Sequence, residues 1–242
     1  MWPIERIALW TRYRKFHRVG DIELQLLDIL ADPARVALDV GANIGVYAYG
    51  LAKVTKVIAF EPISDLAAFL RAARLKGLVC HSCALSDHDG QTSLHIPLHT
   101  KPGKRLNMPS ANIREGVTVP SEERVVDVRR LDGFKIANVG FIKIDVEGLE
   151  QKVLEGGRET IAASRPIVQA ELIDRLAPGC IPWADAYFKA LDYEGFFVGA
   201  DRKTVFDLAA FDGSQRVENF LFAPRERAAQ VRARITERLA AG

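Results

Sequence analysis

Cysteine is scarce in this chain, and long apolar runs are absent. Three cysteines in 242 residues are few and odd in number, so we expect no disulfide framework. No apolar stretch approaches the roughly 20 residues that a membrane-spanning helix needs. The apolar run at residues 7–10 is short and surrounded by basic residues, which argues against a secretory signal. These absences predict a protein of the reducing cytoplasm.

An excess of charge of either sign is also missing. The 33 basic and 31 acidic residues leave a net charge of +2, which gives no reason to expect nucleic acid as a partner. The sequence shows no internal repeat and no low-complexity tract. A chain of this length can form one large α/β domain with a full core. We therefore expect a single domain over residues 1–242, with an N-terminal helical cap (1–33), a catalytic core (36–224) and a C-terminal helix (225–242).

Apolar runs alternate with helical patterns through the middle of the chain. Strands are predicted at 36–40, 57–60, 78–83, 140–144, 167–171, 196–199 and 218–222, and helices at 46–53, 65–76, 147–163 and 183–191. This β-α repetition is typical of a parallel, doubly wound sheet.

Three segments depart from the alternation. Residues 92–97 and 124–128 predict a β-hairpin, and the long polar segment between its strands, 99–123, is expected to be a functional loop. The first thirty residues predict helices in which aromatic and basic side chains mix. Such helices could touch a membrane surface or an anionic glycan, but we expect them to cap the core. The arginine-rich C-terminal helix is expected to present a solvated face.

A glycine-rich turn follows the first predicted strand, and an acid ends the second. Glu61 follows Gly41 by 20 residues, the span expected when a nucleotide lies over the turn and the acid reaches its ribose. Asn43 stands where a dinucleotide turn would have its middle glycine. The acid Asp39 would repel a pyrophosphate but suits a cationic amino-acid tail. The pattern therefore favours S-adenosylmethionine, which has an ammonium group and a ribose but no phosphate.

A second group of polar residues follows the later strands. Alternation places Lys143 and Asp145 on one face of a strand that should be buried, so Lys143 needs a carboxylate partner. Asp145 falls at the carboxyl end of its strand, where open α/β sheets bind ligands. Glu171 ends the next strand in the same way. Glu147 begins the following helix in this interpretation, where it could serve chemistry or complement the helix dipole.

Taken together, these segments resemble FkbM-type methyltransferases. The matching motifs lie in order between residues 36 and 224: Asp39-Val40-Gly41-Ala42-Asn43-Ile44-Gly45, Phe60-Glu61-Pro62, Ala84-Leu85-Ser86-Asp87, Lys143-Ile144-Asp145-Val146-Glu147-Gly148 with Glu150, Pro166 through Glu171, and Asn219 with Leu221-Phe222. The resemblance implies a Rossmann-like sheet of seven strands with the last one antiparallel, S-adenosylmethionine as donor, and O-methylation, frequently of sugar hydroxyls. The N-terminal helices and the 99–123 loop show no such match, and we expect them to decide the acceptor.

The resemblance also suggests which residues form the site. The cofactor-binding candidates are Asp39, Gly41, Asn43, Gly45, Glu61, Pro62, Ser86 and Asp145, and the catalytic candidates are Lys143, Asp145, Glu147, Glu171 and Asn219. In the implied topology Asp145, Glu171 and Asn219 meet on one rim. A base there would take the proton of the acceptor hydroxyl. Asp145, Glu147, Glu171 and a histidine all remain open for that role, and the rim could instead hold a divalent cation.

Three functions are compatible with this sequence. The first is an O-methyltransferase of a sugar hydroxyl in a saccharide, glycolipid or lipo-oligosaccharide. The second is an O-methyltransferase of a polyketide-like small metabolite, and the third is a non-catalytic cofactor-binding scaffold. Four acids at strand ends, Asp39, Glu61, Asp145 and Glu171, argue against the scaffold. We expect a glycan, glycolipid or small-molecule acceptor, no nucleic acid, no transmembrane segment, and at most peripheral membrane contact.

Overall fold

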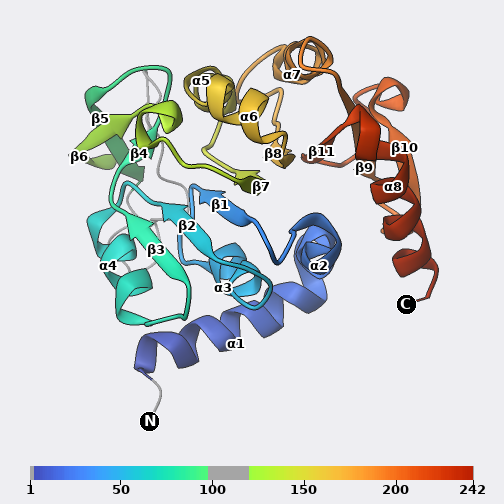
Figure 1. The fold of residues 1–242 in the computed structure, drawn as a ribbon. Helices are drawn as coiled ribbons and strands as arrows, with labels where there is room; N and C mark the ends of the chain where they lie inside the picture. The colour runs from blue at the N-terminus through green and yellow to red at the C-terminus, as the bar shows by residue number, and fades with distance from the viewer. Residues whose placement is uncertain (1–2, 98–119, 242) are drawn as a thin grey trace.

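A mixed eight-stranded sheet runs through the fold in the computed structural model, which describes residues 3–97 and 120–241 (Figure 1). The strand order is β10-β9-β11-β8-β7-β1-β2-β3. The strands are β1 (Val36–Val40), β2 (Val57–Phe60), β3 (Leu78–His81), β7 (Val139–Ile144), β8 (Ile167–Glu171), β9 (Tyr193–Val198), β10 (Val205–Asp207) and β11 (Asn219–Pro224). From β3 to β8 neighbouring strands pair in parallel, and β11 runs antiparallel to β8 and β9. The doubly wound sheet with an antiparallel last strand is thus confirmed, with one more strand, β10, than the seven expected.

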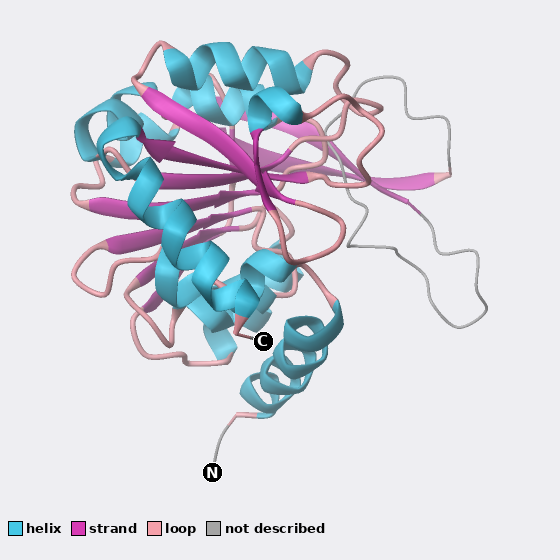
Figure 2. Cartoon of the chain, turned by 90° about the vertical axis from the view of Figure 1, so that its right-hand side faces the viewer, coloured by secondary structure: helices cyan, strands magenta, loops and turns pink. Residues whose placement is uncertain are grey.

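Helices cover both faces of this sheet (Figure 2). One layer consists of α1 (Ile4–Val19), α2 (Leu27–Leu30), α3 (Val46–Leu51), α4 (Ser64–Ala72) and α8 (Arg225–Ala240), and the other of α5 (Glu150–Gly156), α6 (Arg158–Ser164) and α7 (Cys180–Lys189). The alternation of β1 explains the two cores. Ala37 packs with α2, α3 and α8, whereas Leu38 and Val40 pack with α5 to α7. None of the described helices combines the length and apolar character that a membrane span requires.

The predicted hairpin is confirmed and belongs to a small second sheet. β5 (Gly90–Pro97) pairs antiparallel with β6 (Ser121–Arg129), and β4 (Ala84–Leu85) adds a parallel edge. Residues 98–119 lie outside the described part of the chain, so most of the predicted functional loop is not covered. Its last residues, 121–123, belong to β6.

The helix predicted at 147–163 is wrong in its start and its continuity. Glu147 and Gly148 both have positive φ angles, 57° and 97°, which an α-helix cannot include. The Glu150 carboxylate accepts hydrogen bonds from the backbone N–H groups of Val146 and Gly148, so it fixes this turn before α5 begins. Gly157 then separates α5 from α6.

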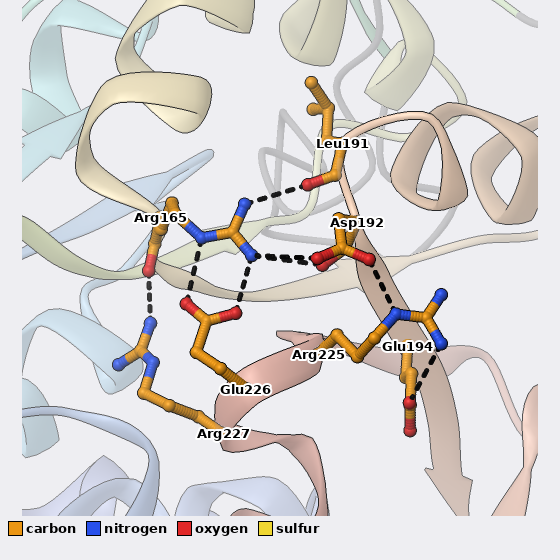
Figure 3. A network of polar contacts seen from close by, with 7 residues as sticks. All are labelled: Arg165, Leu191, Asp192, Glu194, Arg225, Glu226 and Arg227. Atoms are coloured by element: carbon orange, nitrogen blue, oxygen red, sulfur yellow. Dashed lines mark hydrogen bonds and ion pairs between the residues drawn. The ribbon is translucent and has the colours of Figure 1, made fainter.

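The sequence predicted that the C-terminal arginines form a solvated face. In the structure, three of them also form salt bridges with neighbouring elements. Arg225 pairs with Asp192 and Glu194, and a salt bridge joins Glu226 to Arg165 at 2.6 Å (Figure 3). Further along α8, Arg232 pairs with Asp207 and Arg238 with Asp28. Salt bridges therefore attach α8 to Arg165 before β8, to the start of β9, to β10 and to α2, in addition to the packing of its apolar face.

Candidate active site

The carboxyl ends of β1, β7 and β8 and the start of β11 meet at one edge of the sheet. Asp145 follows β7, and its backbone N–H donates to Val40 of β1. Glu171 ends β8 and lies directly opposite Asn219, the first residue of the antiparallel β11. The structure therefore brings Asp145, Glu171 and Asn219 onto one rim, although they are far apart in the sequence.

A cavity opens at this rim. Its described lining includes Gly41, Asn43, Glu61 and Pro62 on one side and Asp145, Glu147 and Glu171 on the other, with an apolar wall that includes Phe60, Ile63, Leu85 and Leu94 between them. The described lining contains four carboxyl groups and no lysine or arginine. Such a lining attracts a cation and disfavours a pyrophosphate.

The glycine-rich turn of this cavity fits a close backbone approach. Gly41 has φ 79°, and a Cβ there would lie 1.9 Å from the carbonyl oxygen of Asp145, so no side chain can be accommodated. Asn43 also has a positive φ, 50°, and its side-chain oxygen is buried with no hydrogen-bond partner in the described structure. A buried acceptor without a partner is costly unless a ligand donates to it. This atom is a place where a bound donor group would be stabilised.

Glu61 is held rigidly beside the turn. Its two carboxylate oxygens accept hydrogen bonds from the backbone N–H groups of Asn43 (2.7 Å) and Ile63 (2.8 Å). The residue is 4% exposed, and burial raises its pKa to about 7. Each oxygen keeps a further lone pair that can accept a hydrogen bond from a hydroxyl group. The geometry suits recognition of a ribose.

Three of the cofactor candidates do not line the cavity. The Asp39 carboxyl is buried, and Asp39 pairs with Lys143 in the register of β1 and β7. Burial raises its pKa to about 7, and one of its oxygens has no partner in the described structure. Gly45 precedes α3 in the left-handed conformation. The Ser86 hydroxyl donates to Asp87.

Lys143, Asp145 and Glu171 form a cluster of titratable groups, in which Lys143 is buried and the two acids are partly exposed. The Lys143 ammonium donates to an Asp145 carboxylate oxygen at 2.9 Å, and the Asp145 and Glu171 carboxyl groups share a hydrogen bond. Burial raises the pKa of Asp145, but the charge of Lys143 and the hydrogen bonds with Glu171 and Lys143 together outweigh burial, so the pKa is lowered. Burial and the charge of Asp145 together raise the pKa of Glu171 to about 9. Near neutral pH, Asp145 is therefore ionised and Glu171 carries a proton.

Glu147 faces the same cavity from the turn before α5. Burial and the nearby charges of Asp145 and Glu150 raise its pKa. It is not a first-turn helix acid, because its positive φ places it outside the helix. Its position at the wall keeps it among the candidates for contact with a bound cation.

A family model described as "Methyltransferase FkbM domain" matches residues 39–192, more than half of the chain. The chain belongs to the FkbM methyltransferase family. The matched segment contains the glycine-rich turn, Glu61, Asp145 and Glu171, so it covers the cavity just described.

One curated protein and one solved structure are similar to this chain. The chain is 28% identical over 195 residues to "2-O-methyltransferase NoeI" of Sinorhizobium fredii (strain NBRC 101917 / NGR234), covering 74% of this chain and 77% of that protein. The crystal structure of methyltransferase FkbM from Methylobacillus flagellatus KT shares the fold, with a TM-score of 0.52 and 17% identity. That match covers 90% of this chain, which spans 55% of the solved chain.

This methyltransferase has a second cavity, of about 600 Å³, on the other side of Glu171. Its described lining is rich in polar groups, among them Asp21, Glu23, Arg202 and Asn219. Glu23 is 3% exposed and its carboxyl pKa is raised to about 7, chiefly by burial. The sequence interpretation missed Asp21 and Glu23, because the topology gives no reason to bring residues before β1 to this edge, and it missed Arg202, which lies in the connection between β9 and β10.

Gln169 and Tyr47 link two residues of the second cavity, Asp21 and Asn219, and were also missed. The Gln169 amide donates to the Tyr47 hydroxyl (2.9 Å) and to the Asn219 side-chain oxygen (2.8 Å), and the Tyr47 hydroxyl donates to Asp21. Asn219 is thereby oriented on the rim. A glutamine in the middle of a strand expected to be buried on both faces was the signal that could have pointed to this network.

No group of three metal-ligating side chains occurs within residues 3–97 and 120–241. The Lys143 ammonium pairs with the Asp145 carboxylate at 2.9 Å, so a metal cation on the rim would have to compete with Lys143 for this carboxylate.

Proposed function

We propose that this methyltransferase uses S-adenosylmethionine to methylate a hydroxyl group of a sugar, in a saccharide, glycolipid or lipo-oligosaccharide. The observation that carries the proposal is the pair of cavities on either side of Glu171: one lined by carboxyl groups without a lysine or arginine in its described part, the other rich in polar side chains. The name of the related 2-O-methyltransferase supports transfer to oxygen.

The residues of the first cavity fit the donor. Glu61 would accept hydrogen bonds from the ribose hydroxyls, and Gly41 and Asn43 would approach the donor through their backbone and amide groups. The carboxyl groups of Asp145 and Glu147 would face its positive charge. When bound, the donor supplies a methyl group on a cationic sulfur that an oxygen can attack in line.

The residues of the rim then prepare the acceptor. A hydroxyl group that enters from the second cavity meets the Asp145–Glu171 pair, which holds one negative charge and one proton near neutral pH. Asp145 accepts the hydroxyl proton as the methyl group is transferred; before that step the Lys143 ammonium and the Glu171 proton hold Asp145 in its ionised form. Asn219, fixed by Gln169, orients the hydroxyl. Buried Glu23, together with Asp21, would accept hydrogen bonds from neighbouring sugar hydroxyls.

We further propose that residues 1–242 act as one domain, because the second cavity needs residues on both sides of the matched segment. We also propose that no divalent cation is required, since Lys143 already neutralises Asp145. A chelator should leave turnover unchanged, whereas a loss that magnesium or manganese restores would assign the rim to a cation.

Mass spectrometry tests the acceptor class. Glycans, glycolipids and small metabolites would be extracted from cells with the intact gene, without it, and with the Asp145→Asn variant. We expect a methyl mass difference on a sugar ring only with the intact protein. A methyl group on a compound without sugar, or on nucleic acid, would overturn the proposed acceptor class.

A further inference from the structure

The first helix, α1, presents an unusual surface to solvent. Of the eight large hydrophobic side chains that are exposed in the described chain, five belong to this helix: Ile4, Ile7, Trp10, Phe16 and Val19. Ile4 is 80% exposed and Val19 73%. Monomeric proteins rarely gather exposed apolar side chains in this way unless something covers them.

The helix is attached to the core by its opposite face. Leu9 is fully buried and packs in a cluster with Tyr49 and Leu70, while Tyr13 lies against Tyr49 of α3. Figure 1 shows α1 along the outer edge of the molecule, and in Figure 2 it stands out beside the N mark. Ile4 and Val19, the most exposed of the five, therefore contribute little to holding the helix in place.

Basic side chains share the exposed face. Arg12, Arg14, Lys15 and Arg18 are all exposed, and none of the four forms a salt bridge with a described carboxylate. The Arg14 guanidinium lies 4.9 Å from the Trp10 ring centre. The helix contains one acid, Glu5. Ile4, Ile7 and Trp10 lie in the N-terminal half of the helix, and Phe16 and Val19 lie in the C-terminal half together with the four basic residues.

We propose that α1 docks the enzyme on an anionic membrane surface. A helix that lies in the bilayer interface inserts apolar side chains among the acyl chains and places lysine and arginine at the lipid headgroups. Tryptophan is the aromatic side chain favoured at that depth, and long basic side chains can extend toward the headgroups. A second copy of the chain fits less well, because α1 offers one acid, Glu5, to pair the four exposed basic side chains that such a contact would cover.

Docking also has a consequence for the second cavity. Asp21 and Glu23, which line it, follow directly after α1 ends at Val19. A docked helix therefore holds this cavity close to the lipid surface. The proposal does not depend on the identity of the acceptor, since binding to vesicles is measured without turnover.

Co-sedimentation with lipid vesicles tests the proposal. The full chain would be mixed with vesicles of phosphatidylcholine alone or of phosphatidylcholine with phosphatidylglycerol. We expect binding to the anionic vesicles only, and weaker binding as salt is raised. Each basic residue near an anionic surface contributes a factor of roughly five, so Arg14→Gln with Arg18→Gln should lower the partition coefficient by roughly 30-fold. Ile7→Ser with Trp10→Ser should lower it by at least about 10-fold.

Val79→Ser with Val125→Ser provides the matched control, because both valines are exposed on strands away from α1. This variant should bind as the wild type does, and circular dichroism should show that every variant is folded at the temperature of the assay. Equal binding to both vesicle types, or no binding even at low salt, would overturn the proposal. So would a wild-type dimer that the Ile7 and Trp10 substitutions convert to a monomer, which would assign the face to a second copy.

Discussion

Substitutions of Asp145 and Glu171 should have very different effects, although both residues carry carboxyl groups and touch each other. At neutral pH Asp145 is the ionised member, because Lys143 lowers its pKa, while Glu171 is protonated. Asp145→Asn removes the one negative charge that can accept the hydroxyl proton. Glu171→Gln keeps a neutral group that can still donate to Asp145. We expect Asp145→Asn to lower kcat by ~10²-fold or more, and Glu171→Gln by less than about 10-fold.

Stability must be separated from catalysis in this comparison. Asp145→Asn leaves the Lys143 ammonium, 2% exposed, without its carboxylate. Removing one partner of a fully buried ion pair costs about 3–5 kcal/mol. The Asp145 side chain keeps 37% exposure, so solvent screening should reduce this cost to about 1–2 kcal/mol. Urea denaturation should show that loss. Calorimetry should show weaker binding of S-adenosylmethionine, because Asp145 would face its positive charge, so kcat is compared at saturating donor.

The pH profile gives a second, independent readout. Turnover of the acceptor found by mass spectrometry should be level around neutral pH and fall above about 9, as Glu171 loses its proton. In Glu171→Gln this alkaline decline should disappear. The reasoning is refuted if Glu171→Gln is the more damaging change, or if wild-type turnover instead rises toward pH 9. Either result would make ionised Glu171 the base.

Three further predictions concern the cofactor turn and the C-terminal helix. Glu61→Ala should weaken S-adenosylmethionine binding by ~1.5–3 kcal/mol in calorimetry, and the wild type should be stabilised against heat by this donor but not by NAD; equal stabilisation by NAD would contradict the cavity assignment. Gly41→Ala should lower the unfolding free energy by about 2 kcal/mol or more, because the new Cβ meets the Asp145 carbonyl. Gly179 has the same φ of 79° but open space around it, so Gly179→Ala should lower the unfolding free energy by only about 1 kcal/mol. Equal losses in the two variants would show that the clash at Gly41 relaxes. Arg165 lowers the Glu226 pKa from 4.5 to about 2, so this pair stabilises the fold above pH 4.5 and the contribution is lost as pH falls toward 2. Since Glu226 is 55% exposed, Glu226→Gln should lower the unfolding free energy by at most about 1 kcal/mol at pH 7. A stability difference between the variant and the wild type that persists near pH 2 would contradict the assignment.

The sequence was informative where local patterns and strand ends carry the structure. Period-2 alternation and the β-α repetition predicted the parallel part of the sheet, and the topology implied by the family resemblance placed Asp145, Glu171 and Asn219 on one rim, as the structure has them. Glu61 sits beside the glycine-rich turn, as the 20-residue spacing predicted. These features depend on residues close in sequence or on strand order, which sequence patterns report well.

The remaining features depend on tertiary contacts that no local pattern encodes. The Asp39 carboxyl was expected at the cofactor, yet Asp39 is buried and lies opposite Lys143 in the strand register. The break in the 147–163 helix arises from backbone angles at Glu147 and Gly148, which a helical pattern of apolar residues does not reveal. β10 has only three residues, so it gives almost no periodic signal.

The second cavity has a consequence for how acceptor preference can be inherited and exchanged. The family match covers residues 39–192, yet of the residues described as lining this cavity only Glu171 falls within that range. Under the proposed function, the matched segment would supply most of the donor side of the reaction, and the segments outside it would supply most of the acceptor side. A chimera that takes residues 3–25 and 199–219 from this chain and the intervening segment from another family member should follow this chain in its choice of acceptor.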